Sequence, residues 1–176
     1  MEPTEKEQKE DLLAQLDGGL KERGFVKKAG VYVMTTAIAK VLIRIYHQRF
    51  SSSVRLDCGL YYVGLEGASA GRTPKQEDWH LKTYVDELLG FPSRLSPDLS
   101  SELIDEYLNM VESEALPKLL KWCDPAHLAT GPSRKQAFGC TQNLWVNVSE
   151  EAWKALCLEL KTVRPKPVAR ARRQRP

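Results

Sequence analysis

Residues 42–65 read LIRIYHQRFSSSVRLDCGLYYVGL, two apolar-rich runs on either side of three serines. The runs are rich in β-branched and aromatic residues, which predicts two strands joined as a hairpin. Successive side chains of a strand point to opposite faces. The apolar face of this hairpin carries Val41, Ile43, Ile45, Val54, Leu56, Cys58, Leu60 and Tyr62. Odd positions of the first strand must then pair with even positions of the second, which requires a loop with an even number of residues.

The opposite face of the hairpin is polar and aromatic. It carries Arg44, Tyr46, Gln48, Arg55, Asp57 and Tyr61. Arginine and tyrosine are enriched at the energetic centres of protein interfaces, so we predict that this face binds a macromolecular partner. The alternative is structural: residues 64–78 or 130–148 cover the face, and Arg44 or Arg55 forms an ion pair with Asp57.

A helix over residues 4–23 is predicted before the hairpin. Thr4 and Glu7 have the spacing of a capping box. The leucines that recur on one helical face are Leu12, Leu13, Leu16 and Leu20. Gly24 lies where a C-terminal capping glycine is expected, and GFVKKAG (24–30) then turns the chain into a strand that starts near Val31.

Residues 64–78 are small and polar and include a proline, which is typical of a surface loop. WHLKTYV (79–85) follows this loop and predicts a fourth strand.

The longest helix is predicted after residue 95. Ser96 is placed to cap it, and Pro97 suits the first helical position. Its apolar residues recur every four positions: Leu99, Leu103, Tyr107, Val111 and Ala115. Pro117 lies inside this pattern and removes one backbone hydrogen bond, so we expect a kink or a break near residues 113–117. A last helix is predicted from Ser149, its cap, to about residue 160, with Trp153, Leu156, Cys157 and Leu160 facing inward.

These elements predict an α+β fold with one domain over residues 1–160. An antiparallel sheet of three to four strands, with residues 31–65 as a meander, is packed on one face by the N-terminal helix and the long helix. A C-terminal helix completes the domain. The helical residues expected against the sheet are Leu12, Leu16, Leu20, Leu103, Tyr107 and Val111.

The positive charge is concentrated at the C-terminus. Residues 161–176 hold seven of the 26 basic residues and no acidic one, which leaves 19 basic against 23 acidic residues in residues 1–160. We expect this Pro- and Arg-rich tail to be disordered and to bind polyanions weakly and without sequence specificity. The residues predicted to do so are Arg170, Arg172, Arg173 and Arg175.

The sequence also predicts a cellular location. The N-terminus alternates charges without an apolar stretch, and no run approaches the length of a membrane span, so a soluble cytoplasmic protein without membrane contact is expected. The four cysteines (Cys58, Cys123, Cys140 and Cys157) lack paired spacing and are expected to be free thiols.

The order of these elements resembles a known family. An amphipathic helix, GFVKKAG (24–30), strands ending in LDCGLYYV (56–63) and a helix carrying ALPKLLKW (115–122) are similar to the bacterial family catalogued as domain of unknown function 4304. The resemblance spans residues 8–125 and implies a small cytoplasmic α+β protein. The family has no established activity, so no catalytic residue is carried over.

No motif for catalysis, a metal or a cofactor is convincing. GASAGRT (67–73) is one residue short of a phosphate-binding loop, has arginine in place of lysine, and is followed by Pro74. Cys123, His127 and Cys140 lack the paired spacing of a zinc site, and nothing brings Cys140 close to a histidine base. We therefore predict no catalytic residue, metal or cofactor.

The sequence leaves three classes of function. A non-catalytic interaction or regulatory module would bind a protein partner through the polar and aromatic sheet face. A small-molecule enzyme would have a pocket between the sheet and the long helix. Weak nucleic-acid binding would use the basic tail.

Overall fold

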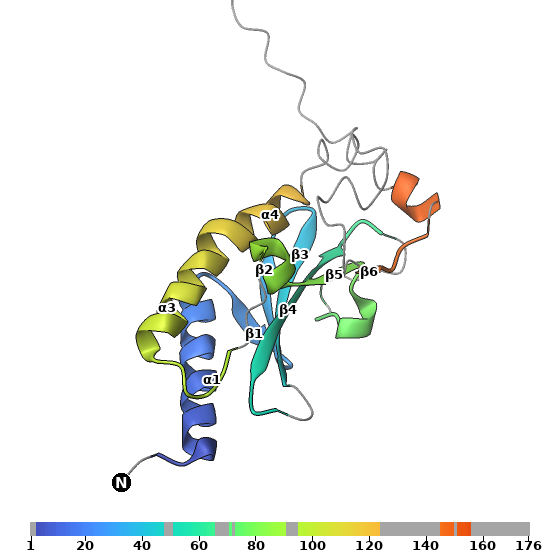
Figure 1. Ribbon diagram of the computed structural model, residues 1–176. Coiled ribbons are helices and arrows are strands. Elements are labelled where there is room, and N and C mark those ends of the chain that lie inside the picture. The colour runs from blue at the N-terminus through green and yellow to red at the C-terminus, as the bar shows by residue number, and fades with distance from the viewer. Residues whose placement is uncertain are drawn as a thin grey trace, which may run out of the picture.

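The sheet is an antiparallel meander in which each strand pairs with its neighbours in sequence, in the order β1-β2-β3-β4-β5-β6 (Figure 1). The computed structural model describes residues 3–47, 51–65, 71, 73–90, 95–123, 145–149 and 151–155. The strands are β1 (Val26–Lys28), β2 (Val31–Thr35), β3 (Ala39–His47), β4 (Val54–Tyr62), β5 (Leu81–Tyr84) and β6 (Trp145–Val146). The predicted α+β class and the predicted meander are confirmed, but the sheet has six strands instead of three to four.

The central hairpin has the predicted register. In β3 and β4, Val41 pairs with Leu60, Ile43 with Cys58 and Ile45 with Leu56, so odd positions face even ones. The last pair is His47 with Val54, which leaves an even number of residues, 48–53, between the strands. The alternating apolar pattern determined this register because a slip by one residue would move the apolar side chains to the other face.

Helix α1 (Glu5–Glu22) has the predicted N-terminus. The Thr4 N–H donates to Glu7 Oε2 at 2.7 Å, and the Glu7 N–H donates to Thr4 Oγ1 at 3.3 Å, which completes the capping box. Gly24 follows the helix with φ of +85°, a left-handed conformation that favours glycine.

The segment after α1 is more than the predicted turn. Its residues Val26–Lys28 form strand β1, which pairs with β2. Ala29 and Gly30 connect the two strands, with φ of 48° and 79°. Two successive positive φ values are typical of the two-residue turns whose twist suits a hairpin.

The long helix begins later than predicted and contains a π-helical segment. It begins with α3 (Ser101–Met110), continues through the π-helical segment η2 (Val111–Ala115) and ends with α4 (Leu116–Lys121). The cap is Ser100, whose hydroxyl accepts the Leu103 N–H, whereas Ser96 begins a turn that ends at the Leu99 N–H. The π-helical segment ends two residues before Pro117 and overlaps residues 113–117, where a kink or break was expected. Its wider turn is a recognised disturbance of helical geometry.

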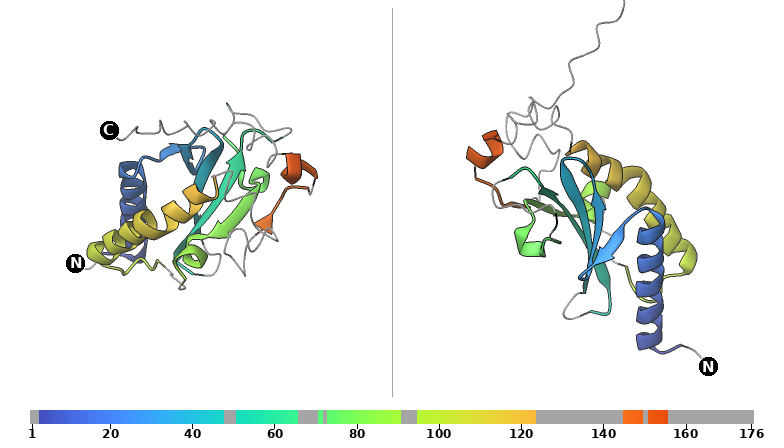
Figure 2. Two further views of the ribbon diagram at one scale, coloured as in Figure 1. Left: turned by 90° about the horizontal axis from the view of Figure 1, so that it is seen from above. Right: turned by 180° about the vertical axis from the view of Figure 1, so that it is seen from behind.

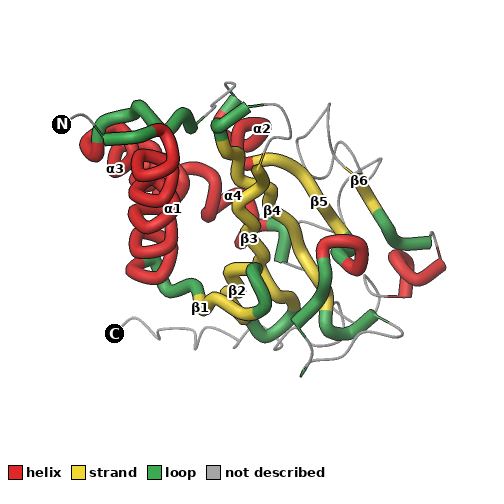
Figure 3. Tube along the Cα trace, turned by 90° about the horizontal axis from the view of Figure 1, so that it is seen from below, coloured by secondary structure: helices red, strands yellow, loops and turns green. Residues whose placement is uncertain are grey.

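One face of the sheet is covered by helices. Helices α1 and α3 lie side by side on it (Figure 3), and α2 (Val85–Leu89) packs between β4 and η2. The predicted core residues Leu12, Leu16, Leu20, Tyr107 and Val111 are buried there. Leu103 was wrongly assigned to the core, because half of its surface is exposed and Ile104 and Leu108 take the inward positions. A four-residue spacing drifts by about 40° per step around an α-helix, so Leu103 cannot share one face with the whole series.

The C-terminal helix is described over residues 151–155 only. The Ser149 hydroxyl accepts the Ala152 N–H at 3.1 Å, which confirms the predicted cap. Trp153 is buried and meets the ring of Tyr62 edge to face. The predicted inward residues Leu156, Cys157 and Leu160 and the whole basic tail lie outside the described residues.

No helix in the described part of the chain combines the length and apolar character needed to cross a membrane.

Candidate functional site

The candidate site lies on the sheet face opposite to α1 and α3 (Figure 2). The β3–β4 register places Arg44 directly opposite Asp57 and Tyr46 opposite Arg55, as the alternation of the hairpin predicted. Pairing continues this face onto the next strands, since Asp57 faces Tyr84, Gly59 faces Lys82, and Lys82 faces Trp145. We call this surface the cationic-aromatic face. Its residues are Arg44, Tyr46, Arg55, Asp57, Lys82, Tyr84 and Trp145.

A buried carboxylate lies at the centre of this face. Asp57 is 1% exposed, and its oxygens lie 3.4 Å from Arg55 Nε and 4.0 Å from Lys82 Nζ. Gln76, in the short 3₁₀ helix η1 (Gln76–Asp78), donates its amide N–H to Asp57 and accepts from Arg44 Nη1 at 2.7 Å. One carboxylate therefore organises three cations, which leaves the cluster with an excess of positive charge.

Aromatic rings hold two of these cations in place. The Arg55 guanidinium lies 3.6 Å from the centre of the Tyr84 ring and 5.1 Å from that of Tyr46. Lys82 Nζ lies 5.6 Å from the centre of the Trp145 ring, which meets Tyr84 edge to face. Cations over aromatic faces are stabilised by the ring quadrupole, so Arg55 and Lys82 are pre-positioned. Trp145 is 44% exposed and offers an apolar ring to a partner.

Part of the predicted polar face is a second, smaller core. Tyr61 was expected on the open face, but it is 5% exposed and packs with Val31, Val33, Leu42 and Trp79. The chain that follows β4 folds back and lays Trp79 against the sheet. The predicted structural alternative therefore holds for Asp57, which pairs with Arg55 and is contacted by Gln76 from residues 64–78. Tyr61 is instead covered by Trp79, which lies just outside that range.

The close approach of Trp79 depends on Gly59. A Cβ atom at this position would lie 2.6 Å from Trp79 Cε3 and 2.2 Å from the backbone oxygen of Leu81. Any side chain at position 59 would therefore displace both the tryptophan ring and strand β5.

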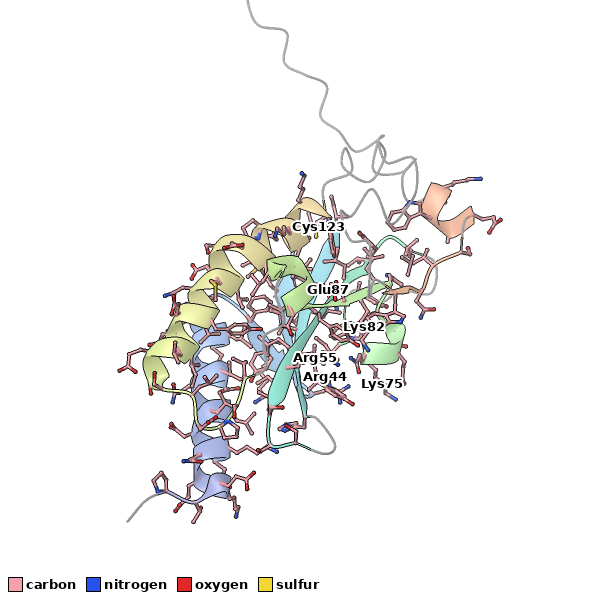
Figure 4. The ribbon with its side chains drawn as sticks, in the orientation of Figure 1. Arg44, Arg55, Lys75, Lys82, Glu87 and Cys123 are labelled. Atoms are coloured by element: carbon pink, nitrogen blue, oxygen red, sulfur yellow. The ribbon has the colours of Figure 1, made fainter. Side chains whose placement is uncertain are left out.

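A cleft of about 1170 Å³ runs beside the face. Its lining includes four cationic side chains, Lys27, Arg44, Lys75 and Lys82, and one carboxylate, Glu77, whose charge is balanced by Lys75 at 3.7 Å. Arg44, Lys75 and Lys82 lie with Arg55 on the side of the sheet away from α3 (Figure 4). The enzyme alternative expected a pocket between sheet and long helix, whereas buried side chains of the main core occupy that space.

The pKa values of nearby groups reflect burial and positive surroundings. Partial desolvation lowers the pKa of His47, and the charges of Lys9 and Arg44 lower it further. Burial also lowers the pKa of Lys40, and repulsion by the charge of Lys28 lowers it further. In each case the charged form of that side chain is disfavoured.

His80, immediately before β5, is held as a neutral acceptor. Its Nδ1 accepts the Tyr62 backbone N–H at 2.8 Å, and its ring stacks on Tyr61 with centroids 4.6 Å apart. Burial lowers the pKa of His80, although Asp78 opposes this effect.

Cysteine chemistry is not favoured in the described residues. Cys58 and Cys123 are buried thiols, and burial raises the pKa of the Cys123 thiol to about 11. No three His, Cys, Asp or Glu side chains of the described residues gather in a group that could hold a metal ion. Cys140, Cys157 and His127 lie outside these residues.

Sequence reasoning placed some site residues and missed others. Arg44, Tyr46, Arg55 and Asp57 are brought together, whereas Gln48 and the tail residues Arg170, Arg172, Arg173 and Arg175 lie outside the described residues. The alternation within LKTY (81–84) was the available signal for Lys82 and Tyr84. Trp145 and Gln76 had no such signal, because one lies in a two-residue strand and the other in a 3₁₀ turn.

No protein-family model matches the chain, and no significant match was found among curated proteins or among solved structures. Membership of the family of domain of unknown function 4304 therefore stays a prediction.

Proposed function

We propose that this protein is a non-catalytic interaction module whose cationic-aromatic face binds an acidic surface of a partner protein. The observation that carries the proposal is the buried Asp57, around which Arg44, Arg55 and Lys82 are gathered in excess of the available negative charge. Pre-positioned charges and exposed aromatic rings are features of interface hot spots. Complementary charge would accelerate association and favour acidic partners over basic ones.

The surface combines rigidity with accessibility. Asp57, Gln76 and the aromatic rings hold the cationic groups, so little side-chain entropy is lost on binding. Arg44, Lys82 and Trp145 are nevertheless partly exposed. A binding role uses all of these features, whereas the described residues that line the cleft include no Ser, Thr or Cys nucleophile.

The test uses substitutions that remove charge but keep hydrogen-bonding capacity. Wild type, Arg44→Gln, Lys82→Gln and Trp145→Ala would serve as baits in lysate, and captured proteins would be purified and titrated by calorimetry. We expect an acidic partner whose affinity falls about tenfold or more for each variant, since each removes an interface contact worth about 1 to 2 kcal/mol.

Matched controls lie on α4, on the other side of the sheet. Lys121→Gln removes one exposed charge, and Leu120→Ala truncates a 38% exposed apolar side chain. Both are expected to keep wild-type affinity. A partner that binds Arg44→Gln and Lys82→Gln as tightly as wild type would show that this face is not the binding surface.

A further inference from the structure

Strand β3 is longer than the strand beside it. Its pairing with β2 ends at Ile43, opposite Tyr32, because the chain turns away at Ala29 and Gly30. On its other side β3 stays paired with β4 as far as His47. Among the described residues, no strand pairs with β3 beyond Ile43 on the β2 side.

The backbone groups of Ile45 and His47 point toward this open edge. The Ala39 carbonyl accepts the Thr36 N–H at 2.9 Å on the β2 side, and the Ile38 carbonyl accepts the Val63 N–H at 3.0 Å on the β4 side. Direction alternates along a strand, so the odd residues of β3 direct their N–H and C=O toward β2. A free edge of this kind is a template for another strand, and nothing in Arg44–His47 blunts it with a proline.

The open edge lies within the cleft, and its two sides differ in chemistry. Arg44, Ile45 and His47 all line the cleft. On the helix side, Leu13 of α1 and the side chain of Ile45 provide apolar surface. On the other side, Arg44 provides positive charge. An added strand would therefore direct alternate side chains toward apolar and cationic surroundings.

We propose that an extended acidic segment of the partner protein pairs with β3 along Arg44–His47 as an additional strand. Its backbone bonds to the N–H and C=O groups of Ile45 and His47, its acidic side chains face Arg44, and the alternate apolar ones face Leu13 and Ile45. This inference rests on the proposed function and specifies its binding mode, strand addition, in which backbone bonds supply affinity and side chains supply specificity.

The free protein tests the geometric premise. We expect the amide hydrogens of Ile45 and His47 to exchange faster with solvent than those of Arg44 and Tyr46, which point toward β4. Equal protection of all four, or protection that rises with protein concentration, would mean that the edge is already covered and would overturn the proposal.

The binding probe is a synthetic ten-residue peptide that alternates glutamate and valine. We expect it to shift the amide resonances of Ile45 and His47 and to protect them from exchange. Two variants of the peptide carry N-methyl groups, one on its odd residues and one on its even residues. Only one of these two sets directs its N–H groups toward the edge, so we expect one variant to bind about tenfold or more weakly and the other to bind as the unmodified peptide. A lysine–valine peptide should bind at least about tenfold more weakly.

Substitution at His47 separates backbone from side-chain effects. His47→Pro removes one edge N–H without touching the β4 ladder, and the extended residue before it tolerates proline. His47→Ala keeps the N–H and loses only the exposed imidazole. We expect His47→Pro to weaken peptide binding about tenfold while His47→Ala binds as wild type. If His47→Pro does not fold, the two N-methylated peptides carry the same test.

The outcomes distinguish this inference from the proposed function. Binding that falls with Arg44→Gln but is unchanged by His47→Pro and by both N-methylated peptides would overturn strand addition and leave the acidic-partner face intact. A wild-type protein that binds no acidic peptide at millimolar concentration, or that binds the lysine–valine peptide equally, would overturn strand addition even if Arg44 and Lys82 remain necessary for a folded partner.

Discussion

Gly18 and Gly19 are neighbours in α1 but face different surroundings. A Cβ atom on Gly19 would lie 2.3 Å from Leu108 Cδ1 of α3, whereas a Cβ atom on Gly18 would have no other atom within 4 Å. Leu108 is 1% exposed, so it has little space into which to move. Alanine at these two positions therefore distinguishes intrinsic helix propensity from the packing of α1 on α3.

The expected magnitudes follow from these contacts. Gly18→Ala should stabilise the protein by about 0.5 to 1 kcal/mol, the gain of alanine over glycine inside a helix. Gly19→Ala makes the same gain but overpacks the helix interface, at a cost of about 1 to 3 kcal/mol. The propensity term cancels in the difference, so the two variants should differ by about 1 to 3 kcal/mol, or about 2 to 12 °C in melting temperature for a chain of this size.

Urea unfolding followed by circular dichroism would measure both free energies of unfolding. Shortening Leu108 to alanine provides the internal control, because it opens the space that a methyl group at position 19 needs. The double variant Gly19→Ala/Leu108→Ala should therefore be more stable than the sum of the two single changes implies. Equal stabilisation by Gly18→Ala and Gly19→Ala would refute the close packing of α1 against α3.

Three further predictions concern the core, the site and the dependence on pH. Leu16→Ala should lower the free energy of unfolding by about 2 to 5 kcal/mol in urea melts. Leu103 is half-exposed, so Leu103→Ala should change this free energy by less than about 0.5 kcal/mol. The reverse order would contradict the assignment of the helix faces. Gly59→Ala should lower the free energy of unfolding by more than about 3 kcal/mol in the same assay, because strand β5 and the Trp79 ring occupy the position of the new Cβ atom. A small loss would mean that the second core is loosely packed. The pKa of His80 is lowered in the folded protein, so the folded state favours the neutral imidazole. The contribution of neutral His80 to stability is therefore complete above the unfolded pKa of about 6.5 and is lost as the pH falls below that value toward the folded pKa. His80→Asn keeps an acceptor for the Tyr62 N–H and should flatten this part of the stability profile, and an unchanged profile would exclude His80 as its origin.

The elements that the sequence predicted correctly depend on short-range patterns. The capping box of Thr4 and Glu7 and the alternation of β3 and β4 are readable because the interacting residues are three positions apart or recur every second position. The same alternation placed Arg44 and Asp57 on one face without knowledge of any other element. Register and facing were therefore properties of the sequence itself.

Strand pairing beyond the hairpin required the tertiary structure. Strand β1 has three residues and β6 has two, and segments this short have no periodicity of their own. They are strands because a longer neighbour presents unpaired backbone groups to them. The same reasoning applies to the edge of β3 that is open among the described residues, which exists because β2 begins only after the turn at Ala29 and Gly30.

Only the tertiary structure decided which residues of the polar face are available to a partner. Tyr61 and Asp57 alternate with core residues as regularly as Arg44 does, yet both are buried. Burial depends on Trp79 and Gln76, which lie on a segment that folds back across the sheet. The period of a strand determines the direction of a side chain, but solvent exposure depends on what packs against that face, and this is decided by contacts between residues that are distant in sequence.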